Sequence, residues 1–254
     1  MSKSYKRGTA LREVSVTMNN GEVFVLLGHN GAGKSTLINV LTGLTDATYG
    51  EAYFRGYSFS TDMAQIQAVC GICPQFDALW DELNAEEHLY VCAAMQGLHG
   101  KYAAEEIKRV LAAVDLSEEG KNMTTTFSGG MKRRLSVCMS VLGDRRKLIF
   151  LDEPTTGVDT INKKRIWELI EKVKEEKIVV LTTHNMEEAD ALGDKIAILH
   201  QGTLKAVGSS LFLKNRYSNG YTLTVVMQKD DHESSETIAS LIKRAAPDAT
   251  LVYS

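Results

Sequence analysis

The sequence predicts an α/β fold whose core is a mainly parallel, doubly wound sheet. Three observations predict it. Short continuous apolar runs alternate with amphipathic helical patterns, as is typical of parallel strands that are covered on both faces. The apolar run at 22–28 ends in a glycine-rich turn that leads directly into a helical pattern. Residues 76–143 show helical patterns alone, which predicts a helical insert within this alternation.

The first half of the chain supplies the opening strands and the insert. Alternating apolar residues over 12–18 predict a half-buried strand, and the continuous apolar run at 22–28 predicts a buried one. Residues 34–44 have helical spacing, and residues 51–56 predict a further strand. Helical patterns then dominate from roughly 83 to 116.

The second half returns to strand–helix alternation. We expect a helix that opens near Ser128 and runs to about Leu142, and a short helix with Asn185 as its N-cap. The other expected elements are a buried strand at 147–153, an amphipathic helix at 160–176, a buried strand at 177–184, and a hairpin at 195–208 that turns at Gln201 and Gly202.

Composition and length limit the possible functions. The 254 residues are 44% hydrophobic and 24% charged, which is ordinary for a soluble globular protein. A net charge of −3 and a pI near 6.1 argue against a dedicated nucleic-acid binder. No apolar run approaches the ~18 residues of a membrane helix, and the first ten residues do not resemble a signal peptide.

Composition changes near the C-terminus. After about residue 228 the chain becomes polar and charged, and residues 229–254 predict only one helix and the start of one strand. Because two such elements cannot bury a core of their own, we expect this segment to be the truncated beginning of another domain.

The cysteines at positions 70 and 73 have the CxxC spacing of a redox or zinc half-site. A zinc site needs a second ligand pair, and no pair with suitable spacing occurs in the sequence. We therefore favour the alternative, in which Cys70 and Cys73 are two small apolar residues of a short strand.

A phosphate-binding loop follows the first buried strand. Residues 28–36, GHNGAGKST, match GxxxxGK[ST] between a predicted strand and a predicted helix, a context that disfavours a chance glycine-rich turn. The glycines let the backbone wrap phosphates, Lys34 can bridge the β- and γ-phosphates, and Ser35 can ligate Mg²⁺. The candidate nucleotide-binding residues here are Gly28, Asn30, Gly31, Ala32, Gly33, Lys34, Ser35 and Thr36.

Two acids end the buried strand at 147–153. Asp152 is placed to hold Mg²⁺, and Glu153 can take a proton from the attacking water. His184 ends the next strand, so it can reach the edge of the γ-phosphate. The alternatives are a solvated acidic strand end and a structural histidine; the upstream phosphate loop favours the catalytic interpretation.

Six elements in this order resemble the nucleotide-binding domain of an ABC transporter. They are GHNGAGKST, Gln75 in CPQ, FSGGM, LIFLDEP, GVD ending at Asp159, and TTH, over about residues 5–200. The resemblance implies the ABC type of P-loop NTPase fold, with an antiparallel β part beside the parallel sheet. It also implies hydrolysis of ATP with Mg²⁺.

The resemblance assigns further roles. Gln75 would sense Mg²⁺ and water and lie where transmembrane domains dock. Asp159 would link two nucleotide sites, and Tyr5 would stack on adenine, its alternative being an exposed N-terminal tyrosine. The stretch containing Ser128, Gly129 and Gly130 would face the γ-phosphate held by a second nucleotide-binding domain, and so would lie far from Lys34 within one chain.

Longer stretches such as CPQFDALWDELNAEEHL and SGGMKRRLSV resemble the A subfamily, whose known members are mostly lipid transporters. The resemblance implies a nucleotide-binding domain over 1–228, with its helical subdomain at about 76–143, and the truncated start of a C-terminal regulatory domain over 229–254. The implied partners are a second nucleotide-binding domain, in a head-to-tail dimer, and the transmembrane domains of the same transporter, with no nucleic acid. The implied location is the cytosolic face of a membrane, as part of a multi-pass protein.

Departures from the usual family pattern leave the catalytic groups in place. Met131 replaces the glutamine of LSGGQ, Gly157 and Val158 differ from the common residues of the D-loop, and Thr160 replaces a common proline. Since Glu153 is present, we expect hydrolysis and not a degenerate binding site.

Two other functions remain as alternatives. One is a soluble ABC ATPase that acts on ribosomes or DNA; its basic linkers and long coiled-coil inserts do not occur in this sequence. The other is a binding or regulatory module with little catalysis, against which the acid pair and His184 argue.

Overall fold

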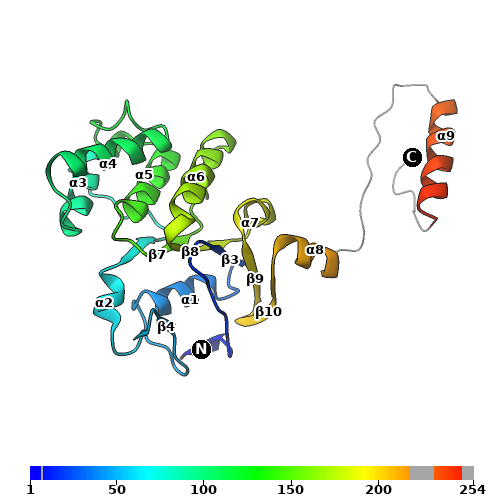
Figure 1. Ribbon diagram of the computed structural model, residues 1–254, viewed down its shortest axis with the longest axis horizontal. Helices are drawn as coiled ribbons and strands as arrows, with labels where there is room; N and C mark the ends of the chain where they lie inside the picture. Colours follow the sequence, from blue (N-terminus) through cyan, green and yellow to red (C-terminus); the bar gives the residue numbers. More distant parts are fainter. Residues whose placement is uncertain (7, 218–231, 248–254) are drawn as a thin grey trace. The chain divides into compact units, whose positions relative to one another are not determined.

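The computed structural model describes residues 1–6, 8–217 and 232–247 (Figure 1). The chain divides into two compact units, Met1–Arg216 and Tyr217–Ser254. The expected boundary at 228 and the expected strand at the end of the chain lie outside the described residues.

A six-stranded sheet forms the centre of the first unit, in the order β10-β9-β3-β8-β7-β6. Its strands are β3 Val23–Leu27, β6 Cys70–Cys73, β7 Leu148–Asp152, β8 Ile178–Thr183, β9 Lys195–His200 and β10 Thr203–Gly208. All neighbours pair in parallel except β9 and β10. The structure thus confirms a mainly parallel sheet with an antiparallel part.

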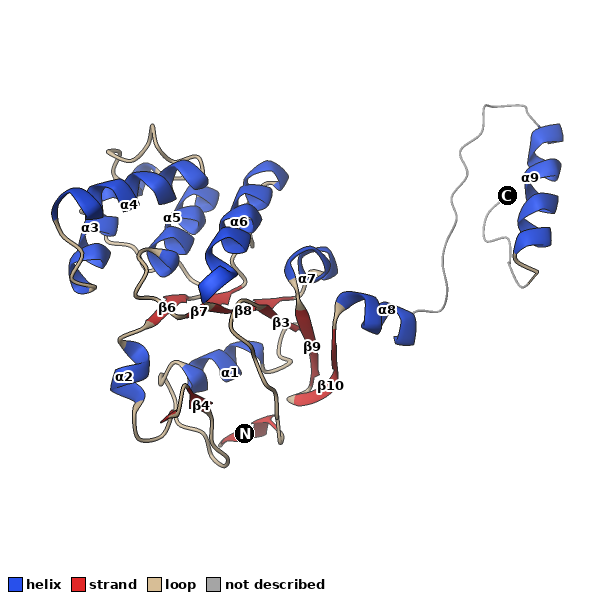
Figure 2. Cartoon of the chain, viewed as in Figure 1, coloured by secondary structure: helices blue, strands red, loops and turns tan. Residues whose placement is uncertain are grey.

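Helices cover both faces of this sheet (Figure 2). One face carries α1 Lys34–Leu41 and α2 Met63–Gln67. The other carries α3 Ala85–Met95, α4 Gly100–Ala113, α5 Gly129–Val141, α6 Thr160–Val173 and α7 Met186–Leu192. Short 3₁₀ turns at Thr124–Thr126 and Lys174–Glu176 precede α5 and follow α6, and α8 spans Ser210–Tyr217.

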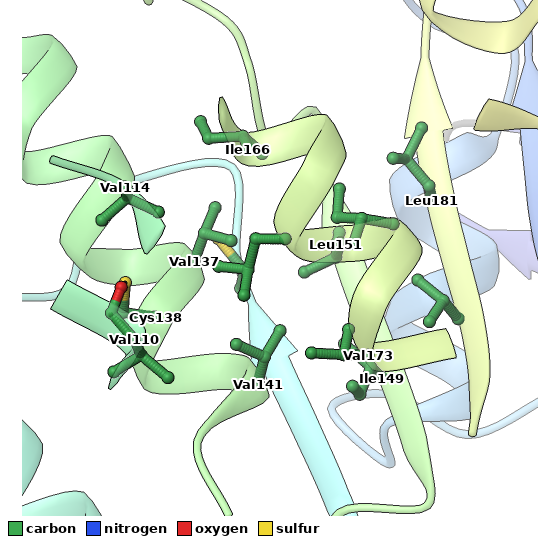
Figure 3. Close-up of a cluster of buried hydrophobic side chains, with 14 of the residues drawn as sticks. Val110, Val114, Val137, Cys138, Val141, Ile149, Leu151, Ile166, Val173 and Leu181 are labelled. Atoms are coloured by element: carbon green, nitrogen blue, oxygen red, sulfur yellow. The ribbon is translucent and has the colours of Figure 1, made fainter. Parts of the chain in front are cut away.

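Alternate residues of each central strand contribute to two separate hydrophobic cores. In β3, Val23 and Val25 face the core beneath α3–α7, whereas Phe24 and Leu26 face the core around α1. This period-2 alternation explains why the strands are apolar throughout. Figure 3 shows part of the first core, where α4, α5 and α6 meet β7 and β8, with the labelled residues Val110, Val114, Val137, Cys138, Val141, Ile149, Leu151, Ile166, Val173 and Leu181.

The predicted helical insert is confirmed: between β6 and β7 the described residues form only helices and loops. Asn84 begins α3 with a capping box, in which its side chain accepts from the Glu87 N–H and the Glu87 side chain accepts from the Asn84 N–H. Helix α5 packs so closely on β6 that a Cβ at Gly71 would overlap the Ser140 carbonyl.

Of two strand predictions in the first half, the one at 12–18 was wrong and the one at 51–56 was too long. Residues 12–18 form no strand, because Glu13 has a φ of 50° and turns the chain; Val14 is nevertheless buried. Residues 51–56 form only the short strand β4 Tyr53–Phe54, which pairs with β5 Tyr57–Ser58. A further antiparallel pair outside the central sheet, which the periodicity did not indicate, is β1 Lys3–Tyr5 with β2 Gly8–Leu11.

The hairpin between β9 and β10 turns where the sequence predicts. Gln201 and Gly202 have φ values of 48° and 74°, as two-residue hairpin loops with matching twist require. The Gly202 N–H donates to the Ala32 carbonyl at 2.9 Å, so the turn rests against the phosphate loop.

Cys70 and Cys73 lie on β6 and are both buried as free thiols. Burial raises the pKa of each to about 12. Cys73 belongs to the hydrophobic core on one face of the sheet and Cys70 to the core on the other, which supports the interpretation of this pair as apolar strand residues.

In the second unit, α9 His232–Ala245 is the described element. No helix among the described residues is long and apolar enough to span a bilayer.

Candidate nucleotide-binding and hydrolysis site

The phosphate loop joins the C-terminal end of β3 to α1. Gly31 and Gly33 have φ values of 80° and 105°, which side-chain-bearing residues rarely adopt. A Cβ at Gly33 would lie 2.7 Å from the Ala10 carbonyl, and one at Gly28 would clash with the Leu199 carbonyl. These glycines therefore let the backbone pass close to its neighbours while it curves around the start of α1.

The start of α1 suits an anion. Gly33, at the N-cap, provides no side-chain hydrogen bond to the first turn, so N–H groups there remain available to a ligand. Ser35 and Thr36 lie half-buried in that first turn, whereas Asn30 is exposed and Ala32 is buried on the loop.

The Lys34 ammonium is surrounded by oxygen atoms of the phosphate loop and of Glu153. Its ammonium donates to the Gly28 carbonyl at 2.7 Å and to the His29 carbonyl at 3.3 Å. It also lies 3.4 Å from Oε1 of Glu153. Because Lys34 is only 5% exposed, these oxygens replace water around its charge.

The two acids at the end of β7 have different surroundings. Asp152 accepts a short hydrogen bond from the Thr182 hydroxyl on β8. The Glu153 N–H donates to the Thr182 hydroxyl oxygen at 3.0 Å, and Glu153 has a φ of 51°. Thr182 therefore positions both acids. It lies two residues before His184 in the sequence, but its pattern did not predict this role.

Three groups converge on the Glu153 carboxyl. His184 Nδ1 lies 3.3 Å from Oε1, the atom that Lys34 also approaches, and the Thr156 hydroxyl donates to Oε2 at 3.2 Å. Burial raises the pKa of Glu153, but the hydrogen bond from His184 and the charge of Lys34 outweigh it, so the pKa lies below its ordinary value. Glu153 is thus a carboxylate at neutral pH, as a proton acceptor must be.

Gln75 lies in the loop that follows β6, and its side chain is exposed. The preceding Pro74 carbonyl accepts a hydrogen bond from Arg133 of α5 at 2.5 Å. No pattern in the sequence singles out Arg133, because it lies between the basic residues Lys132 and Arg134, and Arg134 is also buried.

The FSGGM stretch forms the N-terminus of α5. The Ser128 hydroxyl caps this helix by accepting from the Met131 N–H at 3.3 Å. Gly129 and Gly130 form the first turn, and a Cβ at Gly130 would lie 3.5 Å from the Gly157 carbonyl. Met131 packs against the core beneath α3–α7, which gives a physical reason for an apolar residue at this position.

Asp159 and Tyr5 lie at the edges of the unit. Asp159 is the N-cap of α6: Oδ1 accepts from the N–H groups of Ile161 and Asn162, and Oδ2 accepts from the Asn162 side chain. These bonds lower the pKa of Asp159, the Asn162 side chain being the largest cause. Tyr5 is half-exposed on β1, with the Lys3 ammonium 5.0 Å from its ring centre.

Residues 11–156 match the family model described as ABC transporter. The chain belongs to the ABC transporter family. The human protein named "Phospholipid-transporting ATPase ABCA3" is 44% identical to this ABC chain over 99% of it. The Arabidopsis thaliana protein named "ABC transporter A family member 2" is 44% identical over 89% of it. The chain spans 15% and 23% of the lengths of these two relatives.

Solved structures agree with the family assignment. An ATP-binding subunit of an ABC transporter is 28% identical, with a TM-score of 0.77 over 85% of this chain and 90% of that one. The dimeric, post-hydrolysis cassette MJ0796 bound to ADP and Pi is 25% identical, with a TM-score of 0.75 over 82% and 95%. The predicted family, its resemblance to the A subfamily and its ABC fold are confirmed, and the chain is an ABC-type ATPase domain.

Proposed function

We propose that this ABC domain hydrolyses Mg²⁺-bound ATP to drive the transport of phospholipid-like lipids by the membrane protein that contains it. The observation that carries the proposal is the convergence of Lys34 and His184 on one oxygen of Glu153. The lipid class is supported by the printed name of the ABCA3 relative.

The residues divide the work of hydrolysis. Lys34 leaves the loop carbonyls and Glu153 to bind the β- and γ-phosphates, where its charge stabilises the transition state. Glu153, thereby freed, accepts the proton of the attacking water. His184, already 3.3 Å from Glu153, holds this carboxylate in place and faces the γ-phosphate.

The donor set at this site suits Mg²⁺. We assign the ion to Ser35, Gln75 and the buried Asp152, whose hydroxyl, amide and carboxylate oxygens are the hard ligands that Mg²⁺ prefers. The ion supplies charge neutralisation of the phosphates when bound.

A second nucleotide-binding domain completes the proposed site, with Ser128, Gly129 and Gly130 of one domain facing the γ-phosphate held by the other. Side chains of α1 belong to one core of the sheet and side chains of α5 to the opposite core. This separation of the two helices supports head-to-tail pairing, as does the dimeric title of the MJ0796 cassette. Asp159 would lie at the junction, and Tyr5 would stack on adenine.

The proposal places the domain on the cytosolic face of a membrane. Transmembrane domains of the same transporter would contact it beside Gln75, where Phe76 and Trp80 are exposed. Residues 1–228 would form the nucleotide-binding domain, and residues 229–254 the start of a regulatory domain.

The test uses the full natural protein in phospholipid vesicles, with ATPase activity and lipid movement measured together. Glu153→Gln should abolish turnover and trap ATP, and His184→Ala should lower both activities. Undiminished hydrolysis by Glu153→Gln would contradict the role of Glu153. ATPase activity that responds to ribosomes and not to lipid would instead support the soluble alternative.

A further inference from the structure

Arg133 lies on α5, five residues beyond Ser128, and is 3% exposed. All three nitrogens of its guanidinium donate hydrogen bonds, and their acceptors lie in two other segments of the chain. Nε donates to the Pro154 carbonyl at 3.3 Å, and Nη2 donates to the carbonyls of Asp152 and, at 3.0 Å, Glu153. One buried cation therefore binds three successive carbonyls at the end of β7.

This contact matches the unusual backbone of Glu153. Glu153 has a positive φ of 51°, a left-handed conformation that is unfavourable for a non-glycine residue, so its surroundings must maintain it. The turn at Glu153 brings neighbouring carbonyls toward one guanidinium. Arg133 thereby stabilises the backbone conformation that directs the Glu153 side chain toward Lys34 and His184.

The other side of the guanidinium holds the loop that contains Gln75. Nη1 donates to the Pro74 carbonyl at 2.5 Å and lies 3.4 Å from Oδ1 of Asp77. Asp77 Oδ1 also accepts from the Ser136 hydroxyl at 3.2 Å. Pro74, directly before Gln75, and Asp77, two residues after it, are thus both attached to α5.

We infer that Arg133 is a positioning residue that fixes Gln75 and Glu153 relative to each other and to the FSGGM helix. The inference rests on the proposed roles of Gln75 and Glu153 in hydrolysis. A lysine cannot replace Arg133, because a single ammonium cannot reach both segments in the planar arrangement of a guanidinium. Displacement of Glu153 should slow the chemical step while Lys34 and the phosphate loop still bind ATP.

The experiment compares Arg133→Lys and Arg133→Met with wild type in the full natural protein. Both variants should lower kcat by about 10- to 100-fold and change the KM for ATP by less than about threefold. Lys177→Met is the matched control, since Lys177 is also a buried cation that donates to a carbonyl, that of Gly143 at 3.1 Å. It should lower Tm and leave kcat unchanged.

A double-mutant cycle tests whether Arg133 acts through Gln75. Gln75→Ala should lower kcat by a much smaller factor in the Arg133→Lys background than in wild type, because Gln75 is already misplaced in that background. The inference would be overturned if Arg133→Lys kept the wild-type kcat. It would also be overturned if Gln75→Ala lowered kcat by the same factor in both backgrounds. Glu153→Gln separates this from the proposed function: if that variant is active, the role of Glu153 fails; if it is inactive while Arg133→Lys is normal, only the Arg133 inference fails.

Discussion

The ammonium of Lys34, at the start of α1, and the carboxylate of Glu153, at the end of β7, form an ion pair of 3.4 Å. Both side chains are almost fully buried, and the same carboxylate oxygen is 3.3 Å from His184. If Lys34 binds phosphate and Glu153 accepts a proton, as we propose, ATP would compete with Glu153 for the Lys34 ammonium.

Glu153→Gln should tighten ATP binding by about tenfold, because the neutral amide releases Lys34 to the phosphates. Equilibrium titration with a fluorescent ATP analogue measures this, on a Gly130→Asp background that prevents the proposed dimer. Thr156→Val is the control, since it removes the bond to Oε2 and keeps the ion pair. Equal affinities of Glu153→Gln and wild type would show that the ion pair does not compete.

Glu153 should contribute acid-sensitive stability. Its pKa in the folded state is below the ordinary value of 4.5, so unfolding takes up a proton as the pH falls below that value. The stabilisation is fully present above pH 4.5 and is lost as the pH falls through the folded-state pKa. Urea unfolding of wild type and Glu153→Gln at several pH values should show a difference that shrinks only in this acidic window.

Gly130→Ala should separate stability from catalysis. An added Cβ would lie 3.5 Å from the Gly157 carbonyl, an ordinary contact, and alanine favours a helix over glycine by about 0.5–1 kcal/mol. We expect an unchanged or higher Tm and normal ATP binding. Hydrolysis should fall, because the glycine backbone would face the partner's nucleotide. A fall in Tm would instead indicate that Gly130→Ala lowers hydrolysis by destabilising the single domain.

Glu188 should stabilise the loop that follows Glu153, because it binds Thr155 in that loop. It is 1% exposed and accepts hydrogen bonds from the Thr155 hydroxyl at 2.7 Å and from the Trp167 ring N–H at 3.1 Å. Glu188→Ala leaves two donors without their acceptor and should lower the free energy of unfolding by about 2 kcal/mol or more. The exposed neighbour Glu187 provides the control: Glu187→Ala should change the free energy of unfolding by less than about 0.5 kcal/mol.

The four cysteines should react slowly with alkylating reagents in the native state. Burial raises the pKa of Cys70, Cys73 and Cys138 to about 12, which leaves almost no thiolate at neutral pH. Cys92 is only partly buried and should be modified first. Mass spectrometry of timed iodoacetamide reactions gives the order; early modification of Cys73 would contradict the packing of β6.

Local patterns were enough to predict the strands and the phosphate loop, because burial on both faces makes β3, β7 and β8 continuously apolar. The same patterns misled at 12–18, where Val14 is buried beside a residue with positive φ and no strand forms. Contacts between distant segments could not be predicted. The position of Arg133 in the sequence does not predict its contacts with Pro74 and Pro154. The side chain reaches their carbonyls only because α5 lies against β6 and β7.

The order of strands in the sheet also determines when the site can form during synthesis. Strand β3 carries the phosphate loop and β7 carries the acids, but β8 lies between them and is made last of the three. A nascent chain that has emerged only as far as residue 176 contains β3 and β7, after which Lys34 and Glu153 follow, but lacks the strand that lies between them. The Lys34–Glu153 ion pair should therefore form only after β8 has left the ribosome and inserted between β3 and β7.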